Sequence, residues 1–185
     1  MSDSNHAPLK TATEKPAMEQ YVKPRRIYLA SSWRNPTQPA VLAALRDAGH
    51  EVYDFRNPAP GHEGFSWSDC GGMAASYGSG RGARTIPSYL EAIRSARATE
   101  GFAFDKEALD RCDTCVLALP CGRSAHLELG YATGQGKDTY VLLHEEEFEP
   151  ELMYLLNTGI CASTQELIEV LDPQRCYGRP APQAQ

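Results

Sequence analysis

The segment from Leu119 to Glu128 has the residue types of a binding turn followed by a helix. An apolar run over 114–119 comes first, and Gly122 and Ser124 follow it closely. Glycine adopts backbone angles closed to other residues, and Ser124 can cap a helix whose open amides hold an oxyanion or a phosphate. Glu128 then lies about one turn into the helix. We expect Glu128 to be the centre of an active site; the alternative is that it only pairs with Ser124 and the helix dipole.

A second carboxylate and a polar loop add to this constellation. Asp105 lies in the helix predicted before the same strand, and two carboxyl groups around a strand–loop unit can divide nucleophilic and proton-handling roles. The loop after the first strand offers the hydroxyl groups of Ser31 and Ser32 and the guanidinium of Arg34. Arginine is suited to bidentate recognition of phosphate or carboxylate, although a solvated surface loop is the alternative interpretation.

Strand and helix patterns alternate along the chain. Short apolar runs typical of buried strands occur at 26–30, 51–55, 114–119, 139–143 and 159–161. Helical patterns occur at 39–48, 87–98, 105–112, 126–133, 150–156 and 164–171. This alternation predicts an α/β fold with a parallel sheet covered on both faces, in which ligands bind beyond the carboxyl ends of the strands. We therefore expect the chemistry in the loops 31–34, 56–67 and 120–124.

The expected organisation is one α/β domain over residues 25–172 between two loose ends. Residues 1–24 contain few large apolar side chains and residues 173–185 are rich in proline, which predicts a flexible N-terminal arm and a flexible tail. Residues 57–85 are rich in Gly, Ser, Pro and aromatic residues. A loop of that length either covers a site or contains a short helix.

Composition excludes several classes of partner. The 18 Lys and Arg against 24 Asp and Glu give a net charge of −6, which argues against nucleic acid and against a membrane surface. The chain has no apolar run of roughly 20 residues and no apolar leader, so we expect a cytoplasmic protein with reduced cysteines. Cys112 and Cys115 have the spacing of zinc ligands, but we interpret them as buried thiols, and we expect no metal and no cofactor.

Three runs together carry a resemblance: Tyr28-Leu-Ala-Ser-Ser-Trp-Arg34, Asp105 before Cys112-Asp113, and Glu128-Leu-Gly-Tyr-Ala132 followed by Gly136-Lys137. They resemble the nucleoside 2-deoxyribosyltransferase superfamily, which includes the deoxynucleoside 5′-monophosphate N-glycosidases. The resemblance covers about residues 26 to 143, and its most specific part is the Glu-Leu-Gly-Tyr-Ala run. It implies a flavodoxin- or Rossmann-like, doubly wound sheet of five parallel strands in a single domain, and a homodimer.

The resemblance also implies a reaction at the N-glycosidic bond of a nucleoside or nucleotide. Glu128 would attack the anomeric carbon from the face opposite the base, and water or a second base would resolve the covalent intermediate. Asp105 matches the acid that protonates or holds the leaving base, and Tyr28 matches the tyrosine that orients the nucleophile. The residues expected to bind the substrate are Ser31, Ser32, Arg34, Arg56, Gly122, Arg123 and Ser124, of which Ser32, Arg34 and Ser124 would take the sugar 5′ end or its phosphate.

Departures from the family pattern keep other functions open. The turn before Glu128 is shorter and contains Arg123, and residues 61–84 have no counterpart, so that His62, Trp67 or Tyr77 could cap the base or block it. A nucleotide-binding sensor without turnover and a NAD glycohydrolase are the alternatives. A cytokinin-type phosphoribohydrolase is disfavoured because the turn lacks a glycine run, and no motif of a kinase or phosphatase occurs. His126 should face away from Glu128 on the helix, as a packed or surface histidine.

Overall fold

Five parallel strands form one sheet in the computed structural model, which describes residues 23–70, 85–143 and 148–172. The strands are β1 (Arg26–Ala30), β2 (Glu51–Tyr53), β3 (Thr114–Ala118), β4 (Asp138–Leu142) and β5 (Gly159–Cys161). Their order is β2-β1-β3-β4-β5, and each neighbouring pair is parallel. The predicted five-stranded parallel sheet is confirmed.

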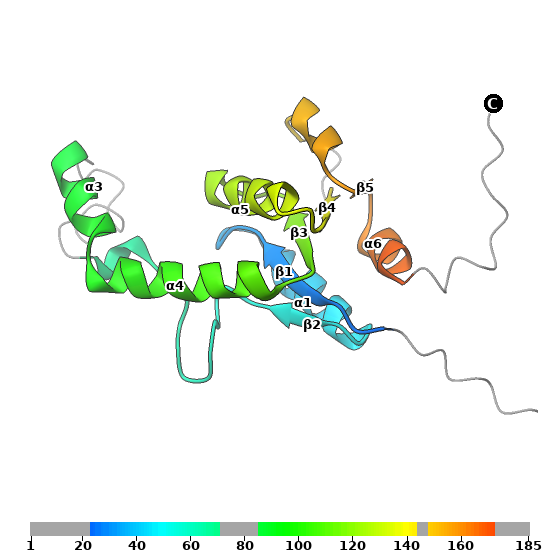
Figure 1. Cartoon of the computed structure of the whole chain (residues 1–185), viewed down its shortest axis with the longest axis horizontal. Coiled ribbons are helices and arrows are strands. Elements are labelled where there is room, and N and C mark those ends of the chain that lie inside the picture. Colours follow the sequence, from blue (N-terminus) through cyan, green and yellow to red (C-terminus); the bar gives the residue numbers. More distant parts are fainter. Residues whose placement is uncertain (1–22, 71–84, 144–147, 173–185) are drawn as a thin grey trace, which may run out of the picture.

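Helices cover both faces of the sheet (Figure 1). The α-helices are α1 (Gln38–Asp47), α3 (Ile86–Ile93), α4 (Ala96–Arg111), α5 (Arg123–Gly134) and α6 (Thr164–Leu171), with 3-10 turns η1 (Trp67–Asp69) and η3 (Leu152–Leu156). In β1, Ile27 and Leu29 pack with α1 and α6, whereas Tyr28 and Ala30 pack with α4 and α5. Alternating side chains thus make the strand apolar on both faces, which confirms the doubly wound arrangement. Within the described ranges, no helix is long and apolar enough to span a membrane.

The bounds predicted around α4 were wrong. One helix from Ala96 to Arg111 replaces the end of the helix predicted at 87–98 and the whole of that predicted at 105–112. The break falls earlier because the Ser95 side chain accepts a hydrogen bond from the backbone N–H of Ala98 and so starts the helix. Gly101 stays inside the helix because Phe65 packs closely there: a Cβ at Gly101 would lie 2.8 Å from Phe65 Cβ.

The start of α5 also differs from the prediction. The helix begins at Arg123, three residues before the predicted start, and Gly122 occupies the N-cap position without a side-chain cap. Ser124 lies inside the first turn, so its predicted capping role is wrong. The helix predicted at 150–156 is the shorter 3-10 turn η3. The predictions for the arm and the tail concern residues 1–22 and 173–185, and part of the predicted long loop is 71–84; these segments lie outside the described residues.

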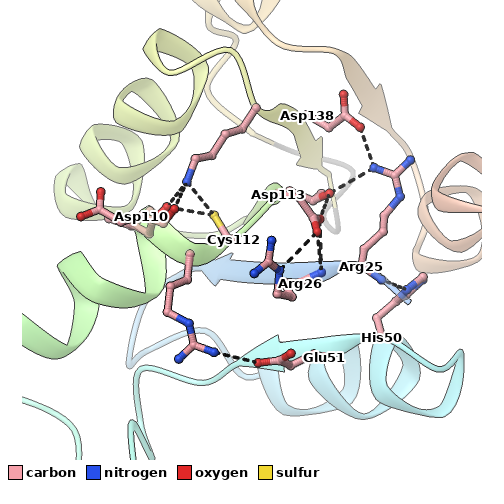
Figure 2. Close-up of polar contacts among 12 residues, drawn as sticks. Arg25, Arg26, His50, Glu51, Asp110, Cys112, Asp113 and Asp138 are labelled. Atoms are coloured by element: carbon pink, nitrogen blue, oxygen red, sulfur yellow. Dashed lines mark hydrogen bonds and ion pairs between the residues drawn. The ribbon is translucent and has the colours of Figure 1, made fainter. Parts of the chain in front are cut away.

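An ion pair and hydrogen bonds join the strands at the sheet edge opposite their carboxyl ends (Figure 2). Arg25 Nη1 lies 2.6 Å from Asp138 Oδ2 and donates to Thr114 Oγ1 at 3.1 Å. Arg25 Nε donates to the carbonyl of Leu171 at 3.0 Å. One arginine before β1 therefore ties together β3, β4 and the end of α6.

His50 is buried beside Arg25, with 5% of its surface exposed. Its Nδ1 accepts a hydrogen bond from the backbone N–H of Arg25 at 3.3 Å, and its Nε2 has no partner among the described residues. Burial, and then the charge of Arg25, lower the pKa of His50 below its ordinary value of 6.5, against the smaller opposite effects of Asp172 and Asp113. The unfolded chain therefore takes up this proton more readily, and the stability present above pH 6.5 is lost as the pH falls below it.

We predict that His50→Asn weakens the loss of stability on acidification. Asparagine keeps an acceptor near the position of Nδ1 and takes up no proton. The measurement is the free energy of unfolding in urea at about pH 7.5 and about pH 5.5. The exposed His62 provides the matched control, because His62→Asn should retain the wild-type pH dependence. An equally steep loss in His50→Asn and wild type would contradict the assignment.

Candidate active site

A cavity of about 1050 Å³ lies at the topological switch point of the sheet. The chain leaves β1 toward α1 on one face and leaves β3 toward α5 on the other, so the loops after these two neighbouring strands diverge. Eight of the ten predicted site residues line this cavity: Ser31, Ser32, Arg34, Arg56, Asp105, Gly122, Ser124 and Glu128. The structure thus brings together residues from the loops after β1, β2 and β3 and from helices α4 and α5.

The other two predicted residues do not line the cavity. Tyr28 is completely buried in β1. Burial raises the pKa of its phenol most, and the charges of nearby Glu128 and Asp105 raise that pKa further. Arg123 is exposed at the first position of α5, outside the cavity lining. Tyr28 can therefore act on Glu128 from within the core, whereas Arg123 does not line the cavity in which a ligand would bind.

Glu128 has the electrostatic environment of a reactive carboxyl group. It is half-buried on α5, and this burial, with a further effect of the Asp105 charge, raises its pKa to about 7. The Tyr28 hydroxyl acts in the opposite direction and lowers the pKa of Glu128, although it lies outside hydrogen-bond geometry with every described residue. Near neutral pH both protonation states of Glu128 are therefore populated, which suits nucleophilic or acid–base chemistry.

Asp105 is held by a tyrosine that the sequence analysis missed. Tyr53 Oη donates to Asp105 Oδ1 at 2.9 Å, and this hydrogen bond lowers the pKa that burial raises. The Tyr53 ring stacks on Tyr28 with ring centroids 5.2 Å apart. A stacked tyrosine pair thus lies beneath the two carboxyl groups. The available signal was that Tyr53 lies within the predicted strand 51–55, whose carboxyl end is on the side of the sheet where ligands bind.

Asn35 fixes the loop after β1 and was also missed. Its buried amide donates to Ser31 Oγ at 2.9 Å and to the carbonyls of Ala118 and Leu119 at 3.2 and 3.0 Å. The Ser31 hydroxyl in turn donates to the Ala118 carbonyl at 2.9 Å. Ser31 and Asn35 therefore join this loop to the carboxyl end of β3. An asparagine just before a proline at a helix start is the signal that predicts such a turn.

The two cavity-lining arginines differ in their contacts. Arg56 Nη2 donates to the carbonyls of Ser32, Trp33 and Asn35 at 3.0, 3.1 and 3.1 Å, and its guanidinium lies 5.6 Å from the centre of the Trp33 ring. These contacts fix the loop backbone, and Arg56 Nε is buried without a hydrogen-bond partner among the described residues. Arg34 is exposed, and its guanidinium makes no hydrogen bond within the described ranges. Arg34 is therefore the cation better placed to receive an anionic group.

The opposite wall of the cavity comes from Phe65 to Asp69. Phe65 and Trp67 meet edge to face at 5.0 Å, and Trp67 also contacts Tyr89 of α3. Of the three residues considered as caps for a base, Trp67 lines this cavity, and His62 lines a different one beside β2. Tyr77 lies outside the described residues. The segment without a family counterpart therefore supplies an aromatic wall to the site.

His126 and the CxxC cysteines lie away from this chemistry. His126 Nε2 is 2.9 Å from Tyr154 Oη and its Nδ1 is 3.0 Å from the Gly122 carbonyl, but the residue is exposed, so it is the surface histidine of the two alternatives predicted. Cys112 and Cys115 are buried free thiols, also as predicted. Among the described residues, no three His, Cys, Asp or Glu side chains are arranged to hold a metal ion.

The fold and the site define a doubly wound α/β protein with a two-carboxyl cavity at its switch point. No family model and no curated protein matches the sequence. Among solved structures, the chain is similar to the CMP N-glycosidase BcmB of Clostridium botulinum, with 16% identity, 78% of this chain and 96% of that chain covered, and a TM-score of 0.43. It is also similar to a 2-deoxyribosyltransferase of Bacillus psychrosaccharolyticus, with 17% identity, 79% and 95% covered, and a TM-score of 0.48. Both proteins belong to the superfamily that the sequence resembles. Because the identities and TM-scores are this low, the activity of this chain has to be argued from the site itself.

We predict that Asp105→Asn lowers the pKa of Glu128 below 7, because the substitution removes the negative charge that helps to raise it. The measurement is a carbon-13 NMR titration of the Glu128 carboxyl. Asp110→Asn is the matched control, since Asp110 lies exposed on the same helix and is paired with Lys106. A Glu128 titration unchanged by Asp105→Asn would show that the two carboxyl groups do not interact.

Proposed function

We propose that the chain cleaves or transfers at the N-glycosidic bond of a nucleoside or nucleotide, with Glu128 as the nucleophile. The observation that carries this proposal is that Glu128 and Asp105 line one cavity, where both carboxyl groups are half-buried and the charge of Asp105 helps to raise the pKa of Glu128. Two carboxyl groups in one cleft are what glycosidic chemistry requires. The sequence resemblance assigns the same two residues to the same roles.

The chemistry follows from these assignments. An ionised Glu128 oxygen forms a bond to the anomeric carbon as the bond from that carbon to the base nitrogen breaks. Asp105 donates its proton to the departing nitrogen or holds the base by a hydrogen bond. In the second step water, deprotonated by Asp105, or a second base attacks the same carbon and releases Glu128. Tyr28, beneath Glu128, orients the nucleophile.

The cavity offers different chemistry at its two ends. Gly122 leaves the first amides of α5 without a side-chain cap, and Ser32, Arg34 and Ser124 line the same region. Such a helix start with a nearby guanidinium suits the sugar 5′ end or its phosphate. The Phe65–Asp69 wall presents aromatic surface suited to a base. A homodimer, implied by the sequence resemblance, is part of the same proposal and is tested by the molar mass in solution.

Glu128→Gln should reduce base release at least about 10³-fold, because the amide cannot form the glycosyl ester. The measurement is chromatography of free base after incubation with nucleosides, CMP and other 5′-monophosphates, and NAD, with and without an acceptor base. Glu107→Gln, at an exposed position of α4, is the control and should retain wild-type turnover. Full turnover by Glu128→Gln would remove the proposal, and ligand binding without base release by wild type would favour a nucleotide-binding module.

Arg34→Ala should raise KM for a 5′-monophosphate about tenfold and change KM for the matching nucleoside little, because only the former carries the anion that Arg34 would bind. Initial rates over a range of concentrations of both substrates provide the measurement. Arg123→Ala is the matched control, since Arg123 is also exposed but lies outside the cavity lining. Equal effects of Arg34→Ala on both substrates would place the 5′ group elsewhere.

A further inference from the structure

Tyr53 connects the two halves of the site, although the sequence resemblance gives it no role. It is the last residue of β2, and its hydroxyl donates to Asp105 Oδ1 at 2.9 Å. Its ring stacks on Tyr28 with an interplanar angle of 21°. Tyr28 in turn lies close enough to Glu128 to affect its pKa. A single half-buried side chain thus contacts the proposed acid directly and the tyrosine beneath the nucleophile.

Tyr53 and Asp105 line two different cavities. Tyr53 lines a second cavity of about 770 Å³ along the open edge of β2, whereas Asp105 lines the main cavity. The tyrosine therefore reaches Asp105 from the side of the second cavity. Within the described ranges Asp105 Oδ2 makes no hydrogen bond, so the contact with Tyr53 engages one carboxyl oxygen and leaves the other for a ligand.

We propose that Tyr53 is a positioning residue, which holds Asp105 by Oδ1 so that Oδ2 meets the leaving base in the main cavity. This role rests on the proposed function, because it needs a base that departs next to Asp105. A carboxyl group on a helix rotates about its side-chain bonds unless a neighbour fixes it, and catalytic groups must be held in place by such supporting hydrogen bonds. Tyr53 is the described residue that donates to this carboxyl group.

The same hydrogen bond controls the charge of the pair. A donor stabilises the ionised form of Asp105, and the charge of Asp105 helps to raise the pKa of Glu128. Loss of the Tyr53 hydroxyl should therefore raise the pKa of Asp105 and shift the proton that the pair shares toward Asp105. The titratable and charged groups around this pair come from several elements: Tyr28 from β1, Tyr53 from β2, Cys115 from β3, Cys121 from the turn before α5, Asp69 from η1, and Arg34, Arg56 and Glu63 from the loops that line the main cavity.

Tyr53→Phe tests the proposal, because phenylalanine keeps the stacked ring and removes only the hydroxyl. Tyr131→Phe is the matched control. Tyr131 Oη donates to Asp110 Oδ1 at 2.7 Å, and Asp110 lies on α4, the helix that also carries Asp105, but lines neither cavity. We expect Tyr53→Phe to lower kcat about tenfold with little change in KM, because the loss of positioning of the Asp105 carboxyl group outweighs its larger protonated fraction. A nitrophenyl glycoside of the same sugar, whose nitrophenolate leaving group needs no proton, should lose less than about threefold, which is under half of the tenfold effect on a logarithmic scale.

A carbon-13 NMR titration of Asp105 in the free protein separates this proposal from the proposed function. The pKa of Asp105 should rise in Tyr53→Phe and stay unchanged in Tyr131→Phe. An unchanged Asp105 titration, or equal losses of kcat with the natural base and with nitrophenolate, would overturn the role of Tyr53. Absence of base release by the wild type would instead overturn the proposed function, while the titration would still decide whether Tyr53 holds the Asp105 carboxyl group.

Discussion

The half-buried carboxyl groups of Asp105 and Glu128 line the same cavity, and the rest of the site depends on how the repulsion between their negative charges is accommodated. Burial disfavours the ionised form of both Asp105 and Glu128, and the charge of one raises the pKa of the other. A hydrogen bond from Tyr53 supports the ionised form of Asp105, whereas Glu128 has a pKa of about 7. The unequal environments give the two groups different affinities for the proton that the pair shares.

The fold places the carboxyl pair at the carboxyl ends of the strands and the Arg25 contacts that join the strands at their amino ends. At the carboxyl ends, α4 and α5 pack on the same face and bring Asp105 and Glu128 to the cavity where the order of the strands reverses. Asn35 and Arg56 hold the loop there through backbone carbonyls. At the amino ends, Arg25 joins the strands and α6. At the amino ends Arg25 is occupied in contacts that hold the fold together, whereas at the carboxyl ends the guanidinium of Arg34 and Asp105 Oδ2 make no hydrogen bond among the described residues.

The order of strands and helices followed from the sequence because apolar runs and helical spacing are local signals. All five strands were predicted within two residues of their bounds, and so was the alternation that requires a parallel sheet. The errors fell where tertiary contacts override local pattern. Gly101 and its neighbours looked like a gap between helices, yet Phe65 packs on that glycine and the helix continues. Likewise Ser124 resembled a cap, whereas the chain turns into α5 before it.

The sequence by itself determined the fold class. It pointed to Glu128 and the loop after β1 as parts of one site, because they follow strands whose carboxyl ends must meet, and to Asp105 through the resemblance of its position to a family pattern. The tertiary structure alone decided which side chains act on them. Tyr53, 52 residues from Asp105 in the chain, donates to that carboxyl group, and Arg56 is largely occupied by loop carbonyls while Arg34 is not. Hydrogen bonds between distant residues depend on distances and directions that no local pattern encodes.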